Sequence, residues 1–133
     1  MDTGLSCYFQ SFGTGGAAFS SDLDDIGFYY NQYQRLMTHW RQVLKLPLLE
    51  IQYEELVDQQ QKVSRRLIDF LDLPWNEACL RFYDNDRVVN TASYAQVRQP
   101  IYTKSVNRHL HYVDHLQPLA RALGSHLTGS RRP

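Results

Sequence analysis

The clearest pattern in the chain is a run of apolar positions between Asp22 and Leu44. They recur at steps of three and four residues, the spacing of an amphipathic helix. Ser21 or Asp22 can cap this helix, and Asp24 and Asp25 suit its first turn. The apolar face consists of Ile26, Tyr29, Tyr30, Tyr33, Met37, Trp40 and Leu44.

A short, mostly apolar segment follows Pro47 and ends at an aromatic residue. The segment Leu48 to Tyr53 predicts a strand buried on both faces of a parallel sheet. Glu54 and Glu55 then open a helix. Ligands of α/β proteins collect beyond the carboxyl ends of strands, so the pattern indicates a nucleotide site beside Tyr53. Alternatively, Tyr53 simply caps the edge of the sheet.

The rest of the chain is predicted to be largely helical. A second helix spans about Asp58 to Leu71, and Asn76 caps a short one after it. From Tyr83 to Tyr102 the sequence is a long polar loop, a type of segment that in compact domains is usually functional or disordered. Helical signal resumes near Ser105 and between Leu116 and Leu127. The sequence predicts at most one further strand, at or just before Leu5.

Composition narrows the range of partners. The chain has 133 residues, 43% of them hydrophobic, which is enough for one globular domain. Lys plus Arg number 14 and Asp plus Glu number 14, so no overall field attracts nucleic acid or an anionic membrane. Cys7 and Cys79 are expected to be reduced thiols. No signal peptide or membrane span is found, and a cytoplasmic location is expected.

The histidines raise the question of a metal site. His109, His111 and His115 lie close together in the sequence. No carboxylate or thiol accompanies them at a fixed spacing, and His109 and His111 point in different directions on a helix. Surface or capping histidines are therefore expected, and no metal.

Three segments, taken together and in order, resemble the later part of the sulfotransferase family. The first runs from Asp2 to Phe9 and is similar to the end of the family's 3′-phosphate motif. By this resemblance Ser6 is the phosphate-binding serine, and a hydroxyl near a helix N-terminus is a suitable anion ligand. Taken alone, Ser6 could equally be a helix cap or a small helical residue.

The second and third segments extend the resemblance to a nucleotide. Ile51 to Val57 followed by Leu73-Pro74-Trp75 is a pair that recurs in the family and implies that Tyr53 lies against the adenine. Thr91 to Tyr102 is similar to the loop that wraps the nucleotide in tyrosylprotein sulfotransferases. Arg108 takes the phosphate-binding role, with Lys104 as a second candidate, unless these are only solvated basic residues. The implied nucleotide contacts are Ser6, Tyr53, Ser93, Gln96, Val97, Tyr102 and Arg108.

The resemblance implies an enzyme of the P-loop sulfotransferase fold, closest to the bacterial branch that is often fused to tetratricopeptide repeats. Such enzymes transfer a sulfuryl group from 3′-phosphoadenosine 5′-phosphosulfate to a hydroxyl or amine of an acceptor. Residues 1–127 would form the C-terminal segment of the domain, α/β in class but mostly helical, and 128–133 a flexible tail. The family's glycine-rich phosphosulfate loop and catalytic base find no match here, so the isolated chain is expected to be inactive.

A non-enzymatic alternative is a helical interaction domain. Tyr29, Tyr33, Met37 and Trp40 form an aromatic stripe that could bind a partner protein or mediate self-association. Nucleotide binding discriminates between the two hypotheses.

Overall fold

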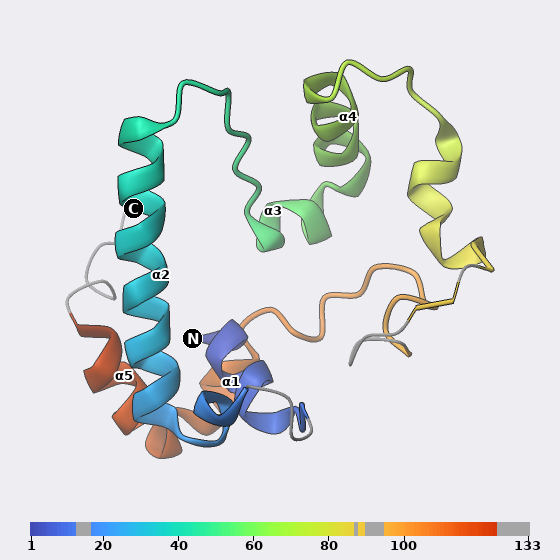
Figure 1. Cartoon of the computed structure of the whole chain (residues 1–133). Coiled ribbons are helices and arrows are strands. Elements are labelled where there is room, and N and C mark those ends of the chain that lie inside the picture. Colours follow the sequence, from blue (N-terminus) through green and yellow to red (C-terminus); the bar gives the residue numbers. More distant parts are fainter. Residues whose placement is uncertain (13–16, 87, 90–94, 125–133) are drawn as a thin grey trace, which may run out of the picture. The chain divides into compact units, whose positions relative to one another are not determined.

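The computed structural model describes residues 1–12, 17–86, 88–89 and 95–124 (Figure 1). These residues fall into two compact units. Unit 1 combines Met1–Leu46 with Asn107–Pro133, and unit 2 is Pro47–Val106. None of the described helices is both long enough and apolar enough to cross a bilayer.

Unit 1 is built around one long helix. α2 (Leu23–Val43) is accompanied by α1 (Asp2–Phe9), α5 (Gln117–Leu123) and the 3-10 helices η1 (Ala18–Ser21) and η3 (Arg108–His115). The predicted helix over 22–44 is thus confirmed nearly residue for residue. Asp22 is its cap, because its carboxylate accepts the N–H groups of Asp24 and Asp25 at 2.8 and 3.1 Å.

The core of unit 1 is formed by residues from α1, α2 and the region of α5. Figure 1 shows α5 lying beside the first half of α2. Apolar side chains from α1, α2 and α5 meet there and exclude water, the main favourable contribution to folding. The buried residues are Leu5, Ile26, Leu116, Leu119 and Leu123, with Met1, Cys7, Phe19, Leu23 and Tyr112 packed around them.

Glycine allows α2 and α5 to approach closely. A Cβ atom added to Gly27 would lie only 2.4 Å from the Cβ of Ala122. A hydrogen bond accompanies this contact, since the Asn31 side-chain amide donates to the Ala122 carbonyl at 2.6 Å. That carbonyl belongs to the last turn of α5, where no partner exists within the helix. Small residues and one polar bond thus fix the crossing of the two helices.

Unit 2 contains α3 (Tyr53–Asp58), α4 (Gln60–Phe70) and the 3-10 helix η2 (Glu77–Asp84). The prediction of a helix over 58–71 is confirmed in its centre, and Val63 is its fully buried residue. Asn76 caps η2 as expected, its side chain accepting the Ala78 N–H at 2.8 Å.

The predicted strands are not formed in the described part of the chain. Residues 47–52 belong to no helix or strand, and a strand is stable only when its backbone groups are paired with those of another strand. Tyr53 is the first residue of α3 instead of the last residue of a strand. Leu5 likewise lies inside α1, whose first turn carries Asp2. The predicted flexible tail, 128–133, lies outside the described residues.

The α2–α5 contact gives a first test. We expect Gly27→Ala to lower the free energy of unfolding by about 1–3 kcal/mol, because the new methyl group overlaps Ala122 in a packed interface. Urea denaturation measures this. Gly4→Ala should lower the free energy of unfolding by less than Gly27→Ala does, since the added Cβ would lie 2.8 Å from the flexible end of the Leu119 side chain. Ala122→Gly should partly rescue Gly27→Ala; a purely additive double variant would contradict the explanation.

Candidate nucleotide-binding site

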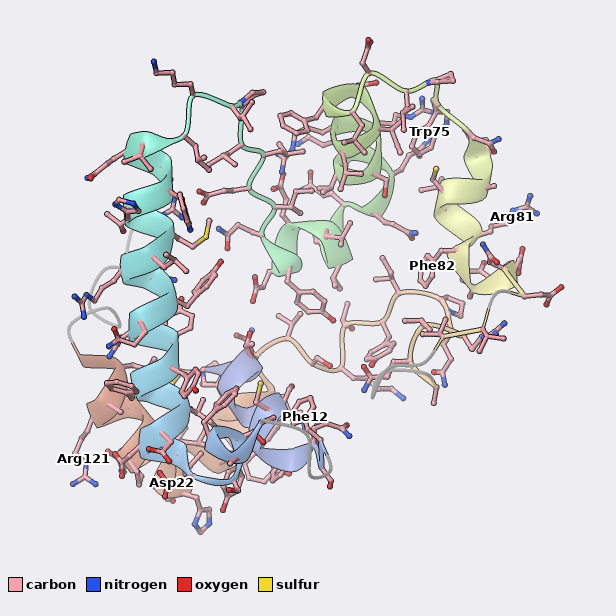
Figure 2. All side chains as sticks on the ribbon, viewed as in Figure 1. Phe12, Asp22, Trp75, Arg81, Phe82 and Arg121 are labelled. Carbon is pink, nitrogen blue, oxygen red and sulfur yellow. The ribbon has the colours of Figure 1, made fainter. Side chains whose placement is uncertain are left out.

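Unit 2 contains an apolar cavity of about 520 Å³, a size typical of small-molecule sites. Its walls come from α3, α4, η2 and the segment that precedes Thr103. In Figure 2, Phe82 and Arg81 point to different sides of η2, and Phe82 is the one that lines the cavity. The lining residues are Ile51, Tyr53, Leu56, Val57, Gln60, Val63, Ser64, Leu67, Ile68, Cys79, Phe82, Gln96, Val97, Gln99, Pro100, Ile101 and Tyr102.

The predicted nucleotide contacts of unit 2 meet in this cavity. Tyr53, Gln96, Val97 and Tyr102 all line it, although Tyr53 and Tyr102 are 49 positions apart in the sequence. Gln96 begins a turn that closes when the Gln99 N–H donates to its carbonyl at 3.3 Å. The residues of this turn and those that follow it line the same cavity as residues of α3 and α4. Ser93, the remaining predicted contact in this loop, lies outside the described residues.

Among the described residues that line this cavity, none has a charged side chain. The tyrosine rings supply flat apolar area and hydroxyl groups, and the glutamine side chains supply amide donors and acceptors. Such walls suit a flat, uncharged ring system with polar edges. They do not suit a phosphate, whose charge would be buried without a counter-ion.

Two arginines on α4 hold the surroundings of the cavity in place. Arg66 donates to both oxygens of Glu55 at 3.2 and 3.0 Å, which ties α4 to α3. Arg65 lies over the Trp75 ring at 4.2 Å. Glu77 accepts from both Arg65 and the Trp75 indole, at 3.1 and 2.9 Å. The Leu73-Pro74-Trp75 turn is thereby fixed against α4, which gives this motif a structural role.

Unit 1 carries the predicted phosphate contacts. Ser6 is exposed on α1, and Arg108 is the exposed first residue of η3. The Arg108 guanidinium carbon lies 5.2 Å from the centre of the Phe9 ring, a cation–π contact that restrains the side chain. Lys104, the second basic candidate, belongs to unit 2 and is also exposed.

Ser6 and Arg108 belong to the same surface of unit 1. Asp2, Ser6 and Phe9 follow one another at helical steps of four and three residues, so they share a face of α1. Asp2 accepts hydrogen bonds from the residues on either side of Arg108, and the Phe9 ring contacts the Arg108 guanidinium. Ser6 lies between these two contacts. A hydroxyl donor and a guanidinium on one exposed face can together bind a phosphate.

Asp2 makes the most extensive polar contact of this face. Its carboxylate accepts the backbone N–H of Asn107 at 2.8 Å and that of His109 at 2.7 Å. The His109 Nδ1 atom lies 2.8 Å from the same carboxylate, which can only accept, so Nδ1 donates. Burial raises the pKa of Asp2, but these hydrogen bonds and the nearby His109 ring outweigh it and hold the pKa below its usual value.

The comparisons with known proteins identify the family of the chain. The model of the sulfotransferase family matches residues 1–77, more than half of the chain. The chain belongs to the sulfotransferase family. A protein of Aquifex aeolicus (strain VF5), described only as uncharacterized, is 34% identical over 125 residues. That alignment covers 92% of the chain but 16% of the relative, so the chain spans a small part of the relative's length. No solved structure gives a significant match.

The sulfotransferase match includes Ser6, Tyr53 and the Leu73-Pro74-Trp75 turn and stops before the polar loop. Sequence reasoning missed Asp2, and it placed His109 with surface or capping histidines instead of in a partly buried hydrogen bond with Asp2. Nothing in the local sequence relates residues 107 positions apart. Among the described residues, no three His, Cys, Asp or Glu side chains gather as metal ligands would.

The lowered pKa of Asp2 makes a pH prediction. A carboxyl group whose pKa is lower in the folded than in the unfolded state stabilises the fold when the pH is above the unfolded pKa, which is about 3.9 for Asp. This stabilisation is lost as the pH falls through the folded pKa. We therefore expect Asp2→Asn to reduce unfolding free energy at about pH 5 and to cost much less near about pH 2. Urea denaturation of both chains measures this. An equal difference at both pH values would show that ionised Asp2 does not stabilise the fold.

Proposed function

We propose that this chain forms the nucleotide side of a sulfuryl-donor site, with 3′-phosphoadenosine 5′-phosphosulfate as the donor. The observation that carries the proposal is the cavity of unit 2. Its described lining residues are uncharged, and they include four of the residues that the family resemblance implies as nucleotide contacts: Tyr53, Gln96, Val97 and Tyr102.

In this proposal the cavity of unit 2 receives the adenine, whose flat ring matches its apolar walls and whose edge nitrogens match amide groups such as that of Gln96. The phosphate contacts that the resemblance implies in unit 1 are the Ser6 hydroxyl and the Arg108 guanidinium, and both groups are suited to an anion. Ser93, by resemblance, adds a hydroxyl donor from the loop.

Sulfuryl transfer also needs a base for the attacking hydroxyl or amine and positive groups around the phosphosulfate. No residue of the 133 is matched to the family's catalytic base or glycine-rich loop. We therefore propose that the segment belongs to the C-terminal part of a P-loop sulfotransferase of the bacterial tetratricopeptide-associated or tyrosylprotein branch. The isolated chain is expected to bind nucleotide without turnover, and labelled phosphosulfate converted by it would contradict this.

The interaction domain remains a second candidate because the apolar face of α2 is exposed. Tyr29 and Tyr33 are each 52% exposed and Trp40 is 39% exposed, with Met37 between them. Exposed aromatic patches of this kind mark protein interfaces. Self-association through this face is compatible with either function.

Titration with 3′,5′-bisphosphoadenosine tests the nucleotide proposal. We expect saturable binding of the 133-residue chain in isothermal calorimetry, weakened about tenfold to a hundredfold by Arg108→Ala, because a hydrogen-bonded charge pair with phosphate is lost. Arg121→Ala is the matched control. Arg121 is also exposed in unit 1 and points away from α5 in Figure 2, so its loss should leave affinity unchanged. No binding by the wild-type chain, with self-association retained, would favour the interaction domain.

The cavity can be tested in the same titration. Val97→Asp places a carboxylate among the uncharged described residues of a cavity that is proposed to bind the adenine, so we expect binding to become undetectable. Val88→Asp introduces the same charge at a residue that is 80% exposed and should change little. Circular dichroism checks that both variants fold. A folded Val97→Asp chain with wild-type affinity would exclude this cavity as the adenine site.

A further inference from the structure

Asp2 acts on both peptide groups that flank Arg108. One carboxylate oxygen accepts the N–H of Asn107, and the other accepts the N–H of His109. The His109 ring adds a third bond to that second oxygen. All these groups belong to unit 1, and Asp2 is only 20% exposed.

The backbone at this point needs such a partner. η3 begins at Arg108, and the first N–H groups of a helix have no acceptor within the helix. Asn107, the residue at the cap position, makes no side-chain capping bond and has a left-handed backbone with φ of 61°. Asp2 therefore supplies, from a distant helix, the acceptor that a cap residue usually provides.

The same helix also restrains the Arg108 side chain. Phe9 lies two turns after Asp2 on α1 and contacts the guanidinium with its ring. The Phe9 ring is in turn held edge-on against Tyr112 of η3, with centroids 5.3 Å apart. α1 thus fixes the Arg108 backbone at one end and its charged group at the other.

We propose that Asp2 is a positioning residue for Arg108, holding the guanidinium where it meets a phosphate of the nucleotide. This inference rests on the proposed function. Asp2 itself does not contact the ligand; it acts by fixing the peptides on either side of Arg108. His109 assists by donating its Nδ1 hydrogen to the same carboxylate.

The sign of one substitution distinguishes positioning from simple electrostatics. A carboxylate near a phosphate site repels the ligand, so its removal should strengthen binding if charge alone matters. If Asp2 positions Arg108, replacing its carboxylate with the Asn amide should weaken binding, because the amide has one acceptor oxygen in place of two for the flanking N–H groups and Arg108 becomes mobile. The two explanations predict opposite changes in affinity.

The experiment is a double-mutant cycle on the 133-residue chain, titrated with 3′,5′-bisphosphoadenosine. We expect Asp2→Asn to weaken binding about threefold to thirtyfold in the wild-type background and less than about twofold in the Arg108→Ala background. Asp24→Asn is the matched control, since Asp24 is an exposed acid in the first turn of α2. It should change affinity in neither background.

Amide hydrogen exchange adds a readout that does not depend on the ligand. In the Asp2→Asn chain the N–H groups of Asn107 and His109 should exchange faster, while the buried amides of α2 should not. If Asp2→Asn does not fold, Asp2→Glu carries the same cycle, because it keeps the charge and displaces the acceptor by one methylene.

The outcomes separate this inference from the proposed function. Unchanged or tighter binding by a folded Asp2→Asn chain, or an equal loss in both backgrounds, overturns the positioning role while leaving the nucleotide site intact. No binding by the wild-type chain overturns the proposed function and this inference with it.

Discussion

The Asp2 carboxylate connects segments of unit 1 that are 105 and 107 positions apart in the sequence. It accepts three hydrogen bonds from Asn107 and His109, and each of them would otherwise leave a donor without a partner. The contact holds the start of η3 against α1 while Leu5, on the same short helix, packs into the core. The exposed face with Ser6 and Arg108 depends on both contacts, because Ser6 lies on α1, Arg108 begins η3, and Asp2 joins these two helices.

Two sets of candidate residues lie in different surroundings, each within its own unit. The described residues that line the cavity of unit 2 are all uncharged, so this cavity suits an uncharged ring better than a phosphate. The face of unit 1 is exposed and carries a guanidinium and a hydroxyl, groups that suit an anion. The region matched to the sulfotransferase family, residues 1–77, contains one residue from each set, Ser6 and Tyr53.

The sequence predicted elements well where the pattern was long and locally marked. α2 has a strong cap in Asp22 and several turns of regular spacing, and its observed bounds differ from the prediction by one residue at each end. The prediction of a strand over Leu48–Tyr53 was wrong. A short apolar run does not indicate whether another strand lies beside it. The turn at Gln96 was recognised only as part of a loop, since its hydrogen bond depends on local backbone geometry.

The sequence by itself determined the long helix α2, the caps Asp22 and Asn76 and the family, because these depend on local spacing and on motifs read in order. The tertiary structure alone decided that Tyr53, Gln96, Val97 and Tyr102 line one cavity and that Asp2 binds the peptides on either side of Arg108. Both facts involve residues far apart in the chain, and the free energy of such contacts depends on packing, burial and backbone geometry. Local sequence does not encode which distant hydrogen-bond donor a carboxylate will find.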